Sequence, residues 1–375
     1  MYSNLPNAIA DVDFPDAGSI EFYKNMLLGQ YRLYGYDLVL PPIVEFADIL
    51  VPQKDEELDL QTFKCIDQLS GKLLGLRADM TPQISRIASA KLSQHGDTPL
   101  RICYVGDVVH TKPRYLGAWR NPLQIGIEIF NGSVPDSEIE VILLLLKSLE
   151  KIGISHVILN LGYSNILDLL LDNLGIESQL QQDLLKCFHN KCISDLKLLL
   201  DQHIKQSYVK QLLLEYAYLY GDINVLQRAI VLLKDFPTIN SYVESLYKIT
   251  AQVDKYIKLQ GVQVSLYVDM TQNTGYSYQE GIIFSAYSAE TKKVLAQGGC
   301  YNVSVGDNLY KAVGFSADLK QLLATNHSLF NEEPRILAPI EDDAKLQALI
   351  SRLREQNNIV VEVKNISDSV NEFLE

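Results

Sequence analysis

The sequence contains few of the residues on which disulfide or metal frameworks depend: 375 residues include five cysteines, six histidines and one tryptophan. The cysteines are odd in number and scattered, which suits free thiols in a reducing cytoplasm better than a disulfide framework. Cys187, His189 and Cys192 lie close together, but no second group with ligand-like spacing accompanies them. We therefore expect a cytoplasmic protein without a metal or another cofactor.

Basic residues and long apolar runs are also scarce. There are 33 basic against 46 acidic residues, a formal net charge of -13, which argues against a surface for tRNA or other nucleic acid. The longest apolar run covers residues 141–146, far short of a bilayer span. The first residues, MYSNLPNAIADVDF, show no basic region followed by an apolar one. We expect neither a membrane segment nor a signal peptide.

What the chain does contain is a regular alternation of helical and strand patterns. Apolar residues recur at helical spacing from 16 to 34, and a Leu-rich helical region extends from 164 to about 259. Strand patterns occupy most of the remainder up to residue 315, among them short runs at 294–297 and 312–315 with an expected turn at Gly298-Gly299. Thr81 is a candidate N-cap for a helix over 83–92. In the tail the expected elements are a strand at 335–339, a helix at 343–356 and a strand at 359–363.

The stretch 103–132 predicts two strands joined by a polar loop. In the second strand Gln124, Gly126 and Glu128 fall on one face, because side chains alternate along a strand. An amide and a carboxylate on one face can hold a small molecule that carries an ammonium group. The spacing alone fits a half-solvated sheet face equally well. Asp79 has a similar ambiguity, as a carboxylate at a helix N-terminus or as a ligand group.

Five motifs occur in one order within residues 5–325. They are Gly35-Tyr36-x-x-Val39-x-Pro41-x-x-x-Glu45, Leu76-Arg77-Ala78-Asp79-Met80-Thr81, the stretch 103–132, Gly275-Tyr276-Ser277-Tyr278 with Gly281-Ile282-Ile283-Phe284, and Gly298-Gly299-Cys300-Tyr301-Asn302 with Ala312-Val313-Gly314-Phe315. In turn they resemble motif 1, the Arg-Pro-Glu-Gly-Thr loop, motif 2, the histidine-specific motif and motif 3 of histidyl-tRNA synthetase, a class II aminoacyl-tRNA synthetase. Each motif is loose alone, but five in order are specific.

The resemblance implies an α+β fold with a mixed, mainly antiparallel sheet flanked by helices, as in the class II synthetases. It implies a synthetase-like core over residues 1–163 and 261–328, with a helical insertion over 164–260. Residues 329–375 remain as a small C-terminal domain with a βαβ-like pattern. This tail is too short for the anticodon-binding domain of such a synthetase, which agrees with a protein that binds no tRNA.

The chain departs from the synthetase pattern at the ATP-binding positions. Where the resemblance places the arginines of motif 2, the histidine-specific motif and motif 3, the sequence has His110, Thr274 and Gln321, and Lys112 replaces the acid of motif 2. Adenylate formation needs permanent cations around the phosphates. A histidine is mostly neutral at pH 7. We therefore expect no amino-acid activation and assign no catalytic residue.

The positions that hold histidine in the synthetase mostly keep their chemistry. The resemblance assigns histidine binding to six residues: Asp79, Thr81, Gln124, Glu128, Tyr276 and Tyr278. Two carboxylates and an amide suit an α-ammonium group, and Glu128 or Tyr278 could bond the imidazole. In an empty cleft the two carboxylates should repel, raising one pKa. The alternative is that these are inherited sheet residues with no ligand.

A synthetase core that has lost its ATP side and its anticodon domain resembles the regulatory subunits of ATP phosphoribosyltransferase. The run Asp79-x-Thr81-Pro82-Gln83 and the Val-x-His ending at His110 also resemble this family, whereas Cys300 and Asn302 depart from it. The resemblance implies a non-catalytic subunit that activates the short catalytic subunit in the first step of histidine biosynthesis. It implies a hetero-octamer, self-association as a dimer through motif 1, and free histidine as the feedback effector.

Three other functions stay open from the sequence. The chain could be a divergent histidyl-tRNA synthetase with a rearranged site. It could be an amino-acid ligase acting on a protein, although this chemistry also needs the missing arginines. It could also be a histidine-binding sensor for another enzyme, which fold resemblance cannot separate from the regulatory reading.

Overall fold

A computed structural model describes residues 5–51, 55–96, 98–115, 117–260, 263–272, 279–325 and 334–364. Its internal contacts divide the chain into two units, Met1–Ser328 and Leu329–Glu375. The first unit contains both a large β-sheet and the helical region that follows residue 163. Each unit is described separately below.

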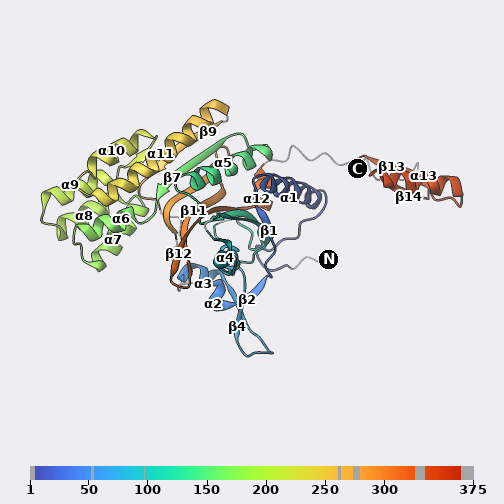
Figure 1. Cartoon of the computed structure of the whole chain (residues 1–375), viewed down its shortest axis with the longest axis horizontal. Helices are drawn as coiled ribbons and strands as arrows, with labels where there is room; N and C mark the ends of the chain where they lie inside the picture. The colour runs from blue at the N-terminus through green and yellow to red at the C-terminus, as the bar shows by residue number, and fades with distance from the viewer. Residues whose placement is uncertain are drawn as a thin grey trace. The chain divides into compact units, whose positions relative to one another are not determined.

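The first unit is built on a nine-stranded mixed sheet (Figure 1). Two neighbouring pairs, β1 with β5 and β7 with β9, are parallel, and the other six are antiparallel. The predicted α+β class with a mainly antiparallel sheet is therefore confirmed. In order across the sheet the strands are β1 (Asp37–Val39), β5 (Leu100–Asp107), β6 (Leu123–Phe130), β12 (Asn308–Asp318), β11 (Val294–Val305), β10 (Gln279–Ser288), β7 (Val157–Tyr163), β9 (Val264–Asp269) and β8 (Tyr220–Gly221).

Strands β11 and β12 are much longer than the short apolar runs that predicted them. They are joined by a tight turn in which Gly306 has a φ of 59°, a conformation that costs glycine little. Polar residues such as Gln297 and Ser316 lie within these strands on the face that carries the site. The expected turn at Gly298-Gly299 is wrong, because both glycines lie within β11 and pair with Phe315 and Gly314 of β12.

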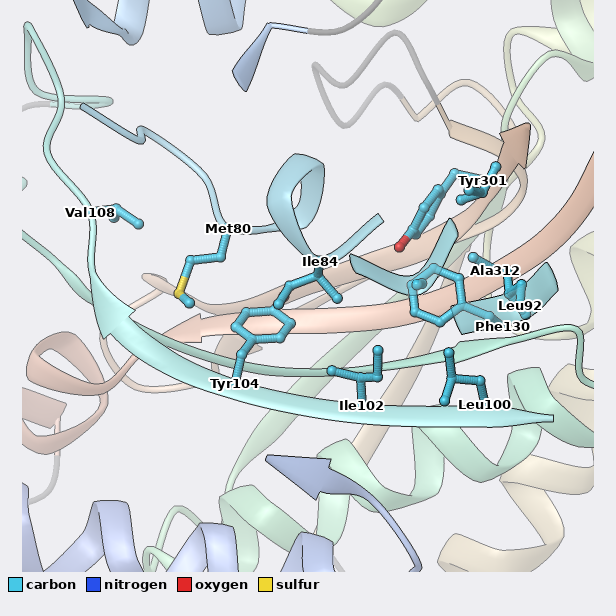
Figure 2. Close-up of a cluster of buried hydrophobic side chains, with 12 residues drawn as sticks. Met80, Ile84, Leu92, Leu100, Ile102, Tyr104, Val108, Phe130, Tyr301 and Ala312 are labelled. Atoms are coloured by element: carbon cyan, nitrogen blue, oxygen red, sulfur yellow. The ribbon is translucent and has the colours of Figure 1, made fainter. Parts of the chain in front are cut away.

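Helix α4 (Thr81–His95) packs along the face of the sheet that carries Gln124 and Glu128. Figure 2 shows Tyr104 and Ile102 of β5 and Tyr301 of β11 pointing toward Ile84 of α4. Helices α1 (Asp16–Leu33), α5 (Asp136–Lys151) and α12 (Leu319–Thr325) also pack against strands of the sheet. Since α4 covers this face only in part, an opening remains at its N-terminal end.

The start of α4 differs from the prediction. The helix begins at Thr81 rather than Gln83, and its N-cap is Met80, which makes no side-chain cap bond. Thr81 is therefore the first helical residue and not the cap. Its backbone N–H and its hydroxyl both donate to Asp79 Oδ1, each at 3.0 Å. The carboxylate of Asp79 thus satisfies one of the free N–H groups at the helix start.

The Leu-rich region folds into helices with their own buried leucines, at one side of the sheet (Figure 1). Helix α11 packs against α5 and β7, and β8 pairs with β9 as the last strand of the sheet, so this region is attached to the core. These helices are α6 (Ile166–Asn173), α7 (Ser178–His189), α8 (Ile193–His203), α9 (Ser207–Tyr216), α10 (Asn224–Leu232) and α11 (Pro237–Gln260). Among the described residues, no helix is both long and apolar enough to cross a membrane.

A small antiparallel sheet lies beside the start of α4. Its order is β2-β4-β3, with β2 (Val44–Phe46), β3 (Phe63–Ile66) and β4 (Leu73–Leu76). Two short helices, α2 (Ala47–Leu50) and α3 (Glu56–Gln61), connect its strands. Large apolar side chains are exposed from β1 through β2, including Leu38 at 48% and Leu40 at 68%. Such a cluster is typical of a surface that contacts another protein.

The second unit contains β13 (Arg335–Pro339), α13 (Ala344–Glu355) and β14 (Ile359–Val363). The strands are parallel, and Ile350 of the helix packs against Ala338 and Val360. The strand, helix and strand predicted for the tail are all present.

Candidate functional site

The core of the candidate site is a hydrogen-bonded group formed by Asp79, Thr81 and Gln124. Gln124 Nε2 donates to Asp79 Oδ1 at 3.0 Å, and its Oε1 accepts from Met80 N at 2.9 Å. One strand residue thereby fixes the turn between β4 and α4. Asp79 is 3% exposed and Gln124 7% exposed. The structure brings these predicted residues together although Gln124 lies more than forty positions from the other two along the chain.

Glu128 lies four residues beyond Gln124 on the same face of β6 and is 3% exposed. Tyr104 of β5 donates its hydroxyl to Glu128 Oε1 at 3.3 Å. Two glycines provide the necessary space. A Cβ on Gly126 would lie 2.6 Å from the Tyr104 hydroxyl, and one on Gly314 would lie 1.9 Å from Glu128 Oε2. Gly126 of the predicted strand therefore leaves the space that the Tyr104 side chain occupies.

Burial raises the pKa of the Glu128 carboxyl well above its ordinary value. The neighbouring hydroxyls of Tyr301 and Tyr104 lower this pKa, and the charge of Asp79 raises it further. Glu128 Oε2 is buried and accepts no hydrogen bond from the described residues. The expected repulsion between the carboxylates is present, but burial is the larger cause. This acceptor is thus available to a ligand that offers a hydrogen-bond donor.

Asp79, Thr81 and Glu128 line one cavity, with Tyr301 and Ser316 among the other lining residues. As bounded by the described residues its volume is about 20 Å³, which is close to the space that one water occupies. Tyr276 and Tyr278, the remaining predicted histidine-binding residues, lie outside the described residues, as does Thr274.

The other side of the cleft is lined by the positions where the synthetase resemblance placed arginines. His110 and Gln321 both line a second cavity of about 200 Å³, and this cavity shares Gln297 and Ser316 with the first. Arg114, Tyr115 and Trp119 of the loop between β5 and β6 also line it. The Tyr115 hydroxyl donates to the Gln321 side chain. The two predicted substitutions therefore face one space.

His110 is neutral at physiological pH. It is 3% exposed, and burial, followed by the charge of Arg114, lowers its pKa to about 4. Its Nε2 lies 3.0 Å from the Ala78 carbonyl oxygen, so this nitrogen carries the proton and donates. Nδ1 is then an acceptor, and it has no partner among the described residues. A neutral acceptor cannot replace an arginine against a phosphate.

Sequence reasoning did not assign Tyr104 or Tyr301 to the site. Tyr301 lies in a quoted motif, and Tyr104 lies in the stretch 103–132, but neither was given a role. The register would have indicated Tyr104, because it lies directly opposite Gly126 in the paired strand. Among the described residues, no group of three or more His, Cys, Asp or Glu side chains is arranged to hold a metal ion.

Curated relatives match almost the whole chain. A protein named ATP phosphoribosyltransferase regulatory subunit from Cupriavidus pinatubonensis is 34% identical over 361 residues, which cover 96% of this chain and 91% of the relative. One of the same name from Burkholderia lata is 35% identical with the same coverage of both chains. The family model for histidyl-tRNA synthetase matches residues 8–322.

Solved structures agree with the fold. A structure entitled ATP phosphoribosyltransferase regulatory subunit/histidyl-tRNA synthetase, from Bacillus halodurans, superposes with a TM-score of 0.84, 22% identity and coverage of 98% of this chain and 96% of that one. Histidyl-tRNA synthetase from Nostoc gives a TM-score of 0.77 at 14% identity, covering 99% and 89%. With its coverage and identity to the curated relatives, the chain belongs to the family of ATP phosphoribosyltransferase regulatory subunits, which share the histidyl-tRNA synthetase fold.

Proposed function

We propose that the chain is a non-catalytic regulatory subunit of ATP phosphoribosyltransferase. It binds the short catalytic subunit, raises its activity in the first step of histidine biosynthesis, and mediates feedback inhibition by histidine. The observation that carries this proposal is the unequal state of the cleft. Asp79 and Gln124 are buried and bonded to each other, and Glu128 nearby accepts from Tyr104, whereas the ATP side has a neutral His110.

The effector site is the cavity beside Glu128. The α-ammonium group of histidine would lie against Asp79 and Gln124, and its imidazole N–H would donate to the free Oε2 of Glu128. Tyr276 and Tyr278 complete the site in this proposal. Because the cavity bounded by the described residues holds about one water, histidine must displace neighbouring side chains. The form with these side chains displaced then binds histidine more tightly than the form with the small cavity, and such a difference in affinity is what allosteric inhibition requires.

Two kinds of association belong to the proposal. The exposed apolar side chains from β1 to β2, including Leu38, Leu40 and Val44, support a dimer through the motif 1 region. The hetero-octamer with the catalytic subunit follows from the family. The acidic net charge of -13 supports a protein that binds no tRNA.

The decisive experiment mixes the purified chain with a short catalytic subunit. We expect the two to co-elute on gel filtration and the formation of phosphoribosyl-ATP to increase strongly. Histidine should then lower this activity. Absence of both association and activation would refute the regulatory function.

A divergent histidyl-tRNA synthetase is the second candidate, because the synthetase family model covers most of the chain. Histidine-dependent exchange of pyrophosphate into ATP by the pure chain would establish it. We expect no such exchange, since His110 and Gln321 offer no cation to the phosphates.

A further inference from the structure

Arg77 is a buried arginine that serves no role in the proposed pocket, although it lies two residues before Asp79. It is 5% exposed. Its guanidinium group donates to the Asp107 carbonyl through Nε at 2.7 Å and to the Pro41 carbonyl through an Nη at 2.7 Å. The same Nη lies 3.4 Å from Gln83 Oε1. One side chain therefore connects the end of β5, the segment between β1 and β2, and the first turn of α4.

The backbone around Arg77 is fixed on the same two sides. Arg77 N donates to the Ile43 carbonyl, and the Arg77 carbonyl accepts from Val109 N, both at 3.0 Å. Gln83 Nε2 adds a bond to the Pro42 carbonyl at 2.8 Å. The main chain then continues directly into Asp79 of the proposed pocket. The bonds to Pro41, Pro42 and Ile43 thus join this group to the β1–β2 segment, whereas the bonds to Asp107 and Val109 hold it against the end of β5 and the residues that follow.

The fold reserves space for this guanidinium group. A Cβ built on Gly106 would lie 2.2 Å from an Arg77 Nη atom, so that a side chain here would displace the guanidinium group from its place against β5. The φ of Gly106 is not positive, so the backbone conformation does not require glycine at this position. The close approach of the arginine is the physical reason for this residue.

The β1–β2 segment that Arg77 holds from inside is apolar outside. Leu38, Leu40, Ile43, Val44 and Phe46 are all 36% exposed or more. Leu33 at the end of α1, which packs against β1, is 79% exposed as well, so large apolar side chains are exposed on both elements. An area of this kind on a chain proposed to dimerise there favours a second copy as its partner.

We propose that Arg77 is a positioning residue that couples the histidine pocket to the dimer face, so that histidine binds more tightly to the dimer than to the monomer. The inference rests on the proposed histidine pocket and dimer. Association of two copies fixes the β1–β2 segment, Arg77 transmits this order to Asp79, and histidine in turn stabilises the dimer by the same factor.

The first test measures L-histidine binding to the full chain by calorimetry. Arg77→Lys and Gly106→Ala should each raise the Kd about tenfold, within the usual range of coupling between sites. The double variant should bind histidine no more weakly than either single variant, because both substitutions disturb the same contact between the Arg77 guanidinium group and β5. Arg101→Lys is the matched control, since Arg101 binds Glu140 through two nitrogens away from the pocket. A Kd for Arg77→Lys within twofold of the wild-type value overturns the inference.

The second test concerns the dimer. Leu40→Asp should give a monomer by analytical ultracentrifugation and raise the histidine Kd about tenfold. Val231→Asp, at a 70% exposed site on α10, should change neither. Saturating histidine should tighten the wild-type dimer but not the Arg77→Lys dimer. A wild-type monomer, a Leu40→Asp dimer, or a monomer with wild-type affinity would each contradict the coupling.

The two levels of the proposal fail differently. If the wild-type chain binds no histidine, the pocket assignment fails, and the coupling with it. If the wild-type chain binds histidine and Arg77→Lys binds it equally well, only the coupling fails.

Discussion

The two sides of one cleft differ in the size of the cavity and in the chemistry of the residues that line it. On the side of Glu128 the polar groups are buried and bonded to each other, around a cavity of about 20 Å³. On the side of His110 the cavity is about ten times larger, at 200 Å³, and its inner group is a neutral imidazole. Both sides belong to the same sheet face and share Gln297 and Ser316. One sheet face therefore carries two cavities that differ in size and in the chemistry of their lining.

The difference follows from the type of interaction that each side requires. A small ammonium-bearing ligand needs acceptors, which carboxylates and amides of a sheet provide in a fixed geometry. A triphosphate needs several permanent cations, and replacing arginine by histidine or glutamine removes this charge without disturbing the fold. Recognition of the amino acid can thus persist while nucleotide chemistry is lost. The following predictions test this contrast.

The largest expected effect is on the Glu128 side. Glu128→Ala should weaken histidine binding about a thousandfold, or about 4 kcal/mol, because it removes one partner of a buried charge-assisted contact. Binding to the catalytic subunit should be unchanged. Isothermal calorimetry and gel filtration measure the two properties. Glu138→Gln, a buried glutamate on α5 outside the cavity, is the control and should bind histidine normally.

The His110 side should determine part of the acid sensitivity. The folded pKa of His110 is about 4, against an ordinary value of 6.5, so the unfolded chain takes up the proton first as the pH falls. Stability is complete above pH 6.5 and is lost between 6.5 and 4, by about 3 kcal/mol for this group. In His110→Asn this loss should disappear. Urea unfolding at a series of pH values measures it, and equal slopes in both proteins would contradict the assignment.

Glu128 should cost stability when the pocket is empty. Because its folded pKa lies above the ordinary value of 4.5, its contribution is complete below this pH and is lost as the pH rises. Glu128→Gln should therefore stabilise the ligand-free protein at pH 7 by about 2 kcal/mol. Thermal unfolding at pH 7 and pH 4 is the measurement. The gain should be smaller at pH 4, and a gain that is independent of pH would point to another cause.

The smallest effect is expected from restoring charge on the ATP side. His110→Arg with Gln321→Arg should tighten ATP binding about tenfold, or about 1.4 kcal/mol, through new charge-assisted contacts. Histidine-dependent pyrophosphate exchange should remain absent, since Thr274 still occupies the third position. Equilibrium dialysis with labelled ATP gives the affinity. Exchange activity in this variant would show that the two sides are less independent than proposed.

Local patterns predicted most of the fold. The tail shows this best, because its strand, helix and strand match β13, α13 and β14 within a residue or two. Strands β11 and β12 are longer than the sequence suggested, because the Gly298-Gly299 pair beside the site lies within β11 and not in a turn. The start of α4 was misplaced because Asp79, rather than Thr81, receives the N–H group at the helix start. Errors therefore gathered where side chains serve the site instead of the core.

The sequence by itself determined the family, the order of the elements and the presence of His110 and Gln321 where the synthetase resemblance places arginines, since each is a property of local residues. Only the tertiary structure decided that Tyr104 bonds Glu128, that His110 is neutral, and that Arg77 joins the pocket to the β1–β2 segment. These facts depend on burial and on contacts between residues about 24 to 36 positions apart. A pKa or a hydrogen bond follows from such neighbours, and strand register rather than spacing along the chain brings them together.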